Sequence, residues 1–213
     1  QWKNLMHFSL TDDQRALQET ARRYAREKLA PNFQSREAYG KFDRDMVLEM
    51  GALGLIAPDL PEKFGGLGID SVTAGLLIEE IAYADLSVSY VQLLTMLCAG
   101  VLARHASEDL AAEYLPQYID GRKMIALGLT EPRGGTDAAN LILRATRDGD
   151  SFILNGEKAS ISSAAQADHC LIAARTGAVG DGARGVTAFL VDLHSTGVTR
   201  SAYNDLGSKA IGR

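Results

Sequence analysis

Two short polar stretches contain the residue types that could bind a ligand. The first, residues 127–137, reads Leu-Gly-Leu-Thr-Glu-Pro-Arg-Gly-Gly-Thr-Asp, and the second, residues 155–163, reads Asn-Gly-Glu-Lys-Ala-Ser-Ile-Ser-Ser. Pro132 breaks the apolar run of the first stretch, and the glycine pair 134–135 lets the backbone turn tightly, so this loop can approach a ligand closely. Its polar side chains are Thr130, Glu131, Thr136 and Asp137. Together with free backbone N–H groups, they could hydrogen-bond a polar ring edge or a phosphate.

The residues between the two stretches predict a β-hairpin. Asp148 and Gly149 form a turn signal between expected strands over 141–146 and 152–154, and Asn155-Gly156 is a second turn of hairpin type. The second stretch therefore follows the first at a short, regular distance. The alternative is that both stretches are only turns of a β-barrel, because turns also favour Gly, Pro, Asn and Asp.

Composition indicates an ordinary globular protein. The 213 residues are 46% hydrophobic, which is enough to fill a core, and we expect two domains. The formal net charge of -5 argues against a nucleic-acid partner, which would need a basic face. We expect no membrane span and no signal peptide, because neither pattern is found. Cys98 and Cys170 make neither a disulfide framework nor a metal-ligand set, and this favours a cytoplasmic location.

The first half predicts a helical domain over residues 1–120. Thr11 and Gln14 form a capping-box pattern, which begins a helix expected to end at Pro31. The other expected elements of this half are helices over 42–53, 71–84 (capped by Ser71), 88–104 and 107–116 (capped by Ser107 and ended at Pro116), and an irregular loop over 55–68.

Two features of these helices allow a functional interpretation. Glu79 and Glu80 could be an acid–base pair, but neighbours on a helix point in different directions, which favours a solvated face with one ion pair. The helix over 88–104 is almost continuously apolar and is therefore expected to be buried. It could also form one wall of a ligand pocket.

The second half, residues 121–213, predicts a β-domain, because the apolar period changes from helical to alternating. Expected strands cover 124–129, 141–146, 152–154, 159–162, 170–174, 186–191 and 198–202, with a mobile loop over 177–185. The expected fold class is therefore α+β, with an all-α domain followed by an antiparallel, barrel-like domain. The histidines at 7, 105, 169 and 194 are scattered, so no metal site is predicted. No motif of a hydrolase or a dinucleotide-binding domain is present.

The order of these motifs resembles the middle domain of the acyl-CoA dehydrogenases. The resemblance rests on Thr-Glu-Pro-Arg-Gly-Gly-Thr-Asp, then Asn-Gly-Glu-Lys, Ile-Ser-Ser, Gln-Ala-Asp and Ala-Ala-Arg-Thr. The 55–68 loop, with its Gly-Leu, Pro-Glu and Phe-Gly-Gly, is similar to a loop of the same family's helical domain. The resemblance covers most of the chain. It implies an FAD enzyme that removes the α-proton of an acyl-CoA thioester and passes the β-hydrogen to the flavin, giving the enoyl-CoA.

The resemblance also implies roles for individual residues. Flavin-binding positions would be Leu127, Leu129, Thr130, Ser160, Ile161 and Ser162, with Thr130 near the pyrimidine edge and Ser162 near N5. Thr136 would bond the CoA portion of the substrate, and Gln92 and Met96 would line the acyl cavity. Electrons would pass to an electron-transfer flavoprotein, and the enzyme would be a homodimer or homotetramer.

Two departures from the family pattern affect these expectations. Ser160 stands where the family has a Trp that packs against the flavin, so a large contact and its shielding are lost. The sequence 206–213 resembles the close of the family's β-domain, but the C-terminal helical domain is missing. Because that domain carries the catalytic Glu, no residue here is assigned as the base, which is expected beyond Arg213. Two alternatives stay open: a flavin oxidase or monooxygenase of the same fold, and a non-catalytic CoA- or partner-binding protein.

Overall fold

The helical half begins at a hydrogen-bonded capping box. Thr11 Oγ1 accepts from Gln14 N at 3.1 Å, and Thr11 N donates to Gln14 Oε1 at 3.0 Å. In this computed structural model, which describes residues 8–213, the box begins α1 (Asp12–Tyr24). The chain then continues through a π-helical turn (Ala25–Leu29), a 3-10 turn (Ala30–Asn32) and α2 (Phe33–Tyr39). The expectation that Pro31 ends the helical path is wrong, because Pro31 lies in the first turn of the 3-10 segment, where its missing N–H is not needed.

Four further α-helices complete this half. They are α3 (Arg44–Ala52), α4 (Ser71–Ala84), α5 (Leu86–His105) and α6 (Glu108–Ile119), with a 3-10 turn (Glu62–Phe64) in the predicted 55–68 loop. Asp70, and not Ser71, caps α4, since its carboxylate accepts from the N–H groups of Val72 and Thr73. Ser107 caps α6 as predicted. Pro116 does not end α6, whose last turn is retained by the buried side chains of Tyr118 and Ile119.

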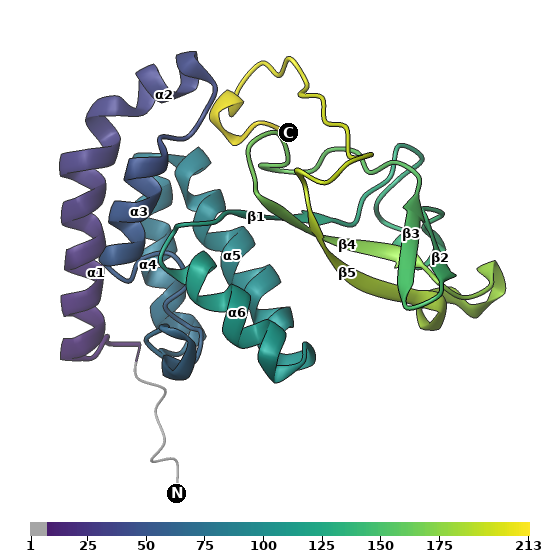
Figure 1. The fold of residues 1–213 in the computed structure, drawn as a ribbon. Helices are drawn as coiled ribbons and strands as arrows, with labels where there is room; N and C mark the ends of the chain where they lie inside the picture. The colour runs from purple at the N-terminus through teal and green to yellow at the C-terminus, as the bar shows by residue number, and fades with distance from the viewer. Residues whose placement is uncertain (1–7) are drawn as a thin grey trace, which may run out of the picture.

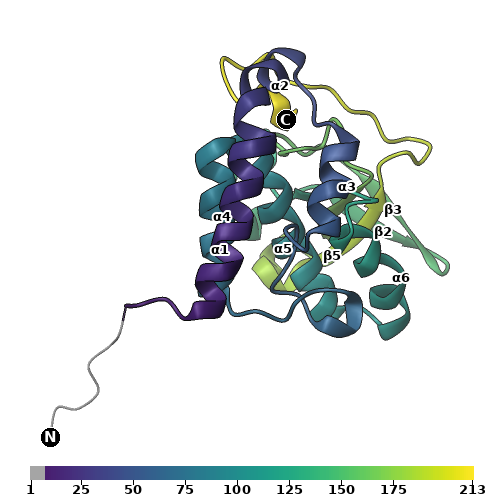
Figure 2. The ribbon, with the colours of Figure 1, turned by 90° about the vertical axis from the view of Figure 1, so that its left-hand side faces the viewer.

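Helix α5 is the central helix of the core. It packs on α4, α6 and β1 (Ile125–Gly128), and eleven of its residues are buried. Helix α4 in turn contacts α1, which runs along it (Figure 2). We expected no segment to be apolar and long enough to span a membrane, and this is wrong. By length and composition alone, α5 could span one. In the structure, 61% of its apolar window is buried, which is the burial of a core helix.

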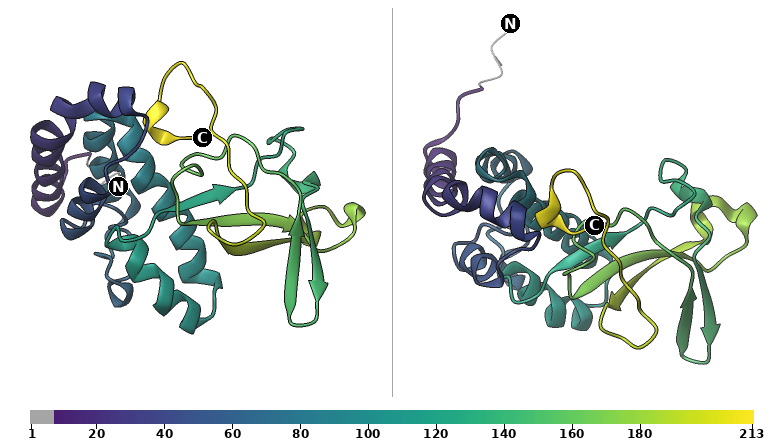
Figure 3. Two further views of the ribbon diagram at one scale, coloured as in Figure 1. Left: turned by 45° about the horizontal axis from the view of Figure 1, so that its top comes forward. Right: turned by 90° about the horizontal axis from the view of Figure 1, so that it is seen from above.

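The second half is a mixed, open sheet and not an antiparallel barrel. Its strands are β1, β2 (Arg144–Asp148), β3 (Ser151–Asn155), β4 (His169–Arg175) and β5 (Val186–Asp192) (Figure 1). Along the sheet the order is β1-β4-β2-β3, and β5 pairs with β4. β4 is parallel to β1, in register Ile125↔His169, and antiparallel to β5. Within residues 8–213, the pairing of β2 with β4 is limited to Arg144↔Arg175, and the β2–β3 hairpin extends away from the helices (Figure 3).

Two predicted strands are absent, and one begins three residues later than predicted. Residues 159–162 turn, because Ser160 has a left-handed φ of 55°, and residues 198–202 are irregular. β2 begins at Arg144 and not at residue 141, because side chains occupy the preceding backbone groups. Glu131 accepts from the N–H groups of Ile142 and Leu143, and Arg175 Nε donates to Leu141 O.

The two halves share one apolar core and are joined by polar contacts. Asp168, just before β4, binds Arg44 of α3, and Tyr118 Oη of α6 lies 2.9 Å from His169 Nδ1. The C-terminal segment crosses back to the helices (Figure 1), where Glu37 of α2 accepts from Lys209 N at 2.9 Å. These contacts fix the sheet on the helical layer.

Candidate functional site

A buried ion pair holds the two polar stretches together. Lys158 Nζ lies 3.0 Å from Glu131 Oε1, and both side chains are almost fully buried. The same ammonium donates to Leu129 O at 3.1 Å, and Ala159 N donates to Thr130 O at 3.0 Å. Residues 129–131 and 158–159 are thus joined by three contacts, so the two stretches meet in space.

Glu131 is fully hydrogen-bonded and is therefore a poor proton acceptor. Burial alone would raise its pKa, but donation from Leu143 N, Ile142 N and Lys158 outweighs burial and lowers the pKa below the ordinary value. A carboxylate held in this way stays charged at neutral pH. Its role is to position the loop, because its donors come from two other segments, the backbone at residues 142–143 and the side chain of Lys158.

The loop between residues 129 and 136 leaves several hydrogen-bonding groups free. Within residues 8–213, neither the backbone N–H nor the hydroxyl of Thr130 has a hydrogen-bond partner, and the same holds for the hydroxyl of Ser162. Gly135 keeps the Thr130 hydroxyl accessible, since a Cβ at this position would lie 3.2 Å from Thr130 Oγ1. Gly156 lets the second stretch pass close to the backbone just before β2, since a Cβ at position 156 would lie 2.9 Å from Leu143 Cα. Free N–H and O–H donors on one loop are the set that a flavin ring edge requires.

Ser162 lies in a pocket formed by both halves of the protein. The pocket has a volume of about 390 Å³ and is lined by Tyr90 of α5, Ser162, Asp205–Ser208, Ile211 and Arg213. Its acid, Asp205, is paired with Arg213 Nε at 2.9 Å. Ser160 is exposed, whereas Ile161 is buried in the core.

The predicted substrate residues do not come together in this pocket. Gln92 is fully buried, and its Nε2 donates to Leu55 O at 2.7 Å, inside the helical core. Met96 lines a different groove of about 450 Å³ between α5 and the loop at Asp59–Pro61. Thr136 is exposed at the tip of its turn, and Leu127 and Leu129 are half-buried. We therefore place Gln92 in the core and not on a ligand surface.

The exposed face of α5 carries apolar residues that sequence reasoning missed. Leu93 and Leu97 are each 46% exposed, and Tyr90, one turn earlier, lines the pocket with Ser162. These three positions share one face because they are three and four residues apart. The signal was hidden in the sequence, since α5 is apolar on nearly every side and no polar face marks the exposed one.

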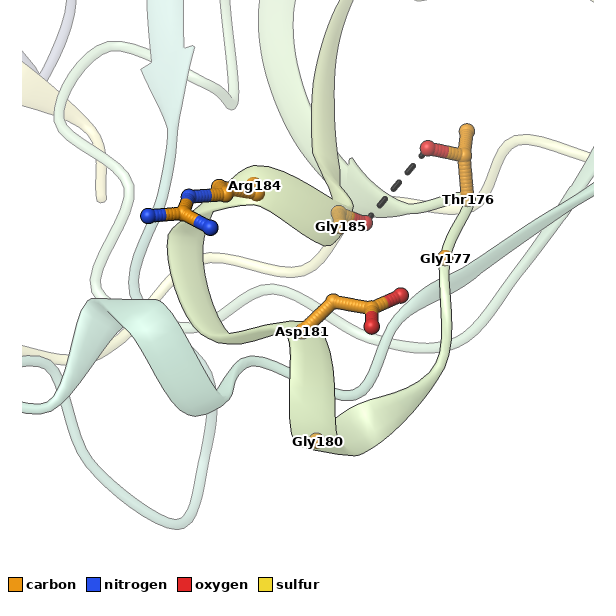
Figure 4. Close-up of a pocket in the computed structure, with 6 residues that line it drawn as sticks. All are labelled: Thr176, Gly177, Gly180, Asp181, Arg184 and Gly185. Carbon is orange, nitrogen blue, oxygen red and sulfur yellow. Dashed lines mark hydrogen bonds between the residues drawn. The ribbon is translucent and has the colours of Figure 1, made fainter.

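The polar pocket at residues 176–185 is separate from these groups. It has a volume of about 460 Å³ and is lined by Thr176, Gly177, Gly180, Asp181, Arg184 and Gly185 (Figure 4). The predicted mobile loop here consists of short 3-10 turns, and the buried Arg175 donates to the carbonyls of Ala178 and Gly182. None of the predicted flavin or substrate residues lines this pocket.

Other candidate groups have structural partners. The expected ion pair is found, since Glu80 pairs with Arg22 at 2.7 Å and accepts from Gln18, but this side chain is only 14% exposed and lies between α4 and α1, so it is not solvated. Glu79 is exposed and forms no ion pair among residues 8–213. Within residues 8–213, no three His, Cys, Asp or Glu side chains gather as metal ligands, and His7 lies outside this range. Cys98 and Cys170 are free and buried, and burial raises the pKa of each thiol to about 12.

The fold and the loop define a two-domain chain that could bind a flavin at the junction of its halves. The N-terminal domain model of acyl-CoA dehydrogenases matches residues 11–122, and the middle domain model matches residues 126–212. The chain belongs to the acyl-CoA dehydrogenase family. It contains the helical N-terminal domain and the sheet domain of that family.

Individual relatives agree with this assignment. The chain is 34% identical over 190 residues to a mitochondrial isobutyryl-CoA dehydrogenase of Dictyostelium discoideum, covering 89% of this chain and 45% of the relative. It is 32% identical over 196 residues to the caffeyl-CoA reductase-Etf complex subunit CarC of Acetobacterium woodii, covering 91% and 51%. The chain thus spans about half the length of the curated relatives it matches.

Solved structures show the same fold. A glutaryl-coenzyme A dehydrogenase–glutaryl-CoA complex superposes with a TM-score of 0.92 and 31% identity, covering 97% of this chain and 53% of the other. A structure of PigA with FAD and proline gives a TM-score of 0.84 and 28% identity, covering 90% and 51%.

Proposed function

We propose that this chain is part of an FAD-dependent enzyme that dehydrogenates an acyl-CoA thioester between its α and β carbons. The observation that carries the proposal is the loop fixed by Lys158 and Glu131, which leaves the N–H and hydroxyl of Thr130 free. When bound, FAD supplies a two-electron acceptor at this place. The chain's own residues bind the ring: Thr130 at the pyrimidine edge and Ser162 near N5, with the backbone at Leu127 and Leu129 alongside.

The catalytic base is proposed to lie outside these 213 residues. Of the acids near Thr130 and Ser162, Glu131 is bound by three donors and Asp205 by Arg213. Abstraction of an α-proton needs a carboxylate free to accept it and a pocket closed to water. Neither acid meets the first requirement.

We further propose that electrons pass to an electron-transfer flavoprotein, because one relative carries Etf complex in its name. The glutaryl-CoA complex supports a CoA thioester as the substrate class, with Thr136 bonding the CoA portion. We also propose that the enzyme is a homodimer or homotetramer and that it is cytoplasmic. The acyl group is not assigned.

A second function is a flavin oxidase or monooxygenase of the same fold. The observation that favours it is that position 160 is an exposed serine, so this position supplies no aromatic ring to shield a flavin. PigA, solved with FAD and proline, shows that a protein of this fold can have a ligand other than a CoA thioester. Oxygen consumption compared with reduction of an artificial acceptor, both with an acyl-CoA panel, distinguishes the two functions.

FAD binding is tested with the naturally occurring full chain. The Thr130→Ala/Ser162→Ala variant removes two hydrogen bonds of roughly 1 kcal/mol each, so FAD should bind about 30-fold more weakly. Thr187→Ala is the matched control, because its hydroxyl bonds Thr176 in the sheet, away from the loop. Wild-type FAD affinity in the double variant would refute the site. Dehydrogenation by residues 1–213 alone, at the rate of the full chain, would refute the placement of the base.

A further inference from the structure

One peptide group links Lys158 to the free donor of the candidate site. Lys158 Nζ donates to Leu129 O at 3.1 Å, and that carbonyl belongs to the same peptide unit as the N–H of Thr130. Thr130 N has no acceptor within residues 8–213. The ammonium therefore contacts one end of a peptide whose other end is open to a ligand.

A charged donor on a carbonyl strengthens the N–H of the same peptide. Hydrogen bonds in a chain polarise one another, by about 10–30% per bond in condensed phases. The effect is larger where water is excluded, and the Lys158 side chain is only 7% exposed. Glu131, at 3.0 Å from Nζ, offsets part of the lysine charge, but the ammonium itself donates to the Leu129 carbonyl.

From these contacts we infer that Lys158 is a positioning residue that tunes the flavin through the Leu129–Thr130 peptide, making Thr130 N–H a stronger donor to the pyrimidine edge. This inference rests on the proposed function, since it takes the flavin to lie at this loop. Reduction of a flavin places negative charge on its pyrimidine side, so a stronger donor there binds the reduced form more than the oxidised form. Lys158 therefore raises the reduction potential.

The readout is the ratio of the affinities for reduced and oxidised FAD, measured as the two-electron midpoint potential of the full chain. Lys158→Met should lower this ratio about tenfold, which is about 30 mV for a two-electron couple. Lys158→Arg should restore most of the shift, because its guanidinium also donates. Lys123→Met is the matched control, because this lysine pairs with Asp168 and, among residues 8–213, makes no hydrogen bond to the 129–136 loop. Glu131→Gln should shift the potential in the opposite direction, since it leaves the lysine charge without its counter-ion.

If Lys158 has a purely structural role, its loss should weaken the binding of oxidised and reduced FAD equally and leave the midpoint potential unchanged. This result would overturn the inference. So would a shift of the same size in Lys123→Met. The second measurement uses the flavin-free protein labelled with 15N-threonine, in which Lys158→Met should move the Thr130 amide proton upfield. An unmoved resonance refutes the polarisation. If wild-type protein binds no FAD, the proposed function fails, while the amide shift still decides whether Lys158 acts on this peptide.

Discussion

Arg44 of α3 lies 2.5 Å from the carboxylate of Asp168, which ends the turn before β4. The other oxygen of Asp168 is 3.4 Å from Lys123, and Met124 N donates to the carboxylate at 2.7 Å. Burial raises the pKa of Asp168, but the donors from Met124, Arg44 and Lys123 outweigh burial and lower it. One acid thus joins the helical layer, the start of β1 and the start of β4.

Replacing Asp168 by Ala should destabilise the protein by about 1–3 kcal/mol, because the buried N–H of Met124 loses its acceptor. Chemical denaturation measures the free energy of unfolding. Asp12→Ala serves as a control, since Asp12 forms an exposed ion pair with Arg15, and it should change stability little. Equal effects of the two substitutions would show that Asp168 does not hold the two halves together.

The same carboxylate should make the protein sensitive to acid. Because the folded pKa of Asp168 is lowered, its contribution is present above the unfolded value near 4 and is lost as pH falls through the folded value. The unfolding free energy of wild type should therefore fall below pH 4 more steeply than that of Asp168→Asn. Parallel curves for the two proteins would contradict this expectation.

His169 should give a second pH dependence, nearer neutrality. Burial lowers its pKa, and Asp192 and Asp168 offset burial only in part. The unfolded chain then takes up a proton near pH 6.5 more readily than the folded one, so stability falls as pH drops below about 6.5. Urea titrations at pH 7.5 and 5.5 measure the loss. His169→Asn should flatten it.

Gln92→Ala should lower the free energy of unfolding by about 2 kcal/mol, because it leaves a cavity and removes the donor to Leu55 O. Its effect on the KM for any acyl-CoA should be small, since the side chain is buried in the helical core. Leu93→Ala, on the exposed face of α5, is the comparison and should have the smaller effect on stability. A large rise in KM for Gln92→Ala with unchanged stability would return this residue to the substrate site.

Ser160→Trp should tighten FAD binding by about 1 kcal/mol through aromatic packing and should slow reoxidation by oxygen. Ser160 is exposed, so a larger side chain has room. Its left-handed φ of 55° disfavours a bulky residue, so the variant should also be less stable to unfolding. FAD titration and stopped-flow reoxidation measure both effects. If neither changes, position 160 does not face the ring.

Local signals predicted the helical half well. The capping pair Thr11 and Gln14, the N-cap Ser107 and the apolar α5 all depend on neighbours in sequence, and each is found. Pro116 does not end its helix because the buried side chains of Tyr118 and Ile119 hold the last turn of α6. Pro31 does not end the helical path because it lies in the first turn of a 3-10 segment, where its missing N–H is not needed. Asp70 displaced Ser71 as a cap because its carboxylate reaches two N–H groups.

The sheet was predicted less well because its backbone partners are side chains far away in sequence. Glu131 takes two N–H groups of residues 142–143, Arg175 takes the carbonyl of Leu141, and Arg200 donates to the carbonyls of Ala164 and Ala167. These contacts replace ladder hydrogen bonds that an alternating pattern would predict. The meeting of the two polar stretches was foreseeable from their motifs, whereas the lysine bond to Leu129 O was not.

The pairing of β1 with β4 imposes an order on synthesis. His169 lies 44 residues after its partner Ile125, and β4 is also the partner of β5 and, at one residue, of β2. On the ribosome, β1 therefore emerges and must wait several seconds for β4, at about 5–20 residues per second. The helices emerge earlier and depend on local contacts, so they can fold first and cover one face of the waiting strand. A translational pause once residue 130 has left the ribosomal tunnel would prolong the exposure of its unpaired edge, and a pause once residue 200 has left the tunnel would not.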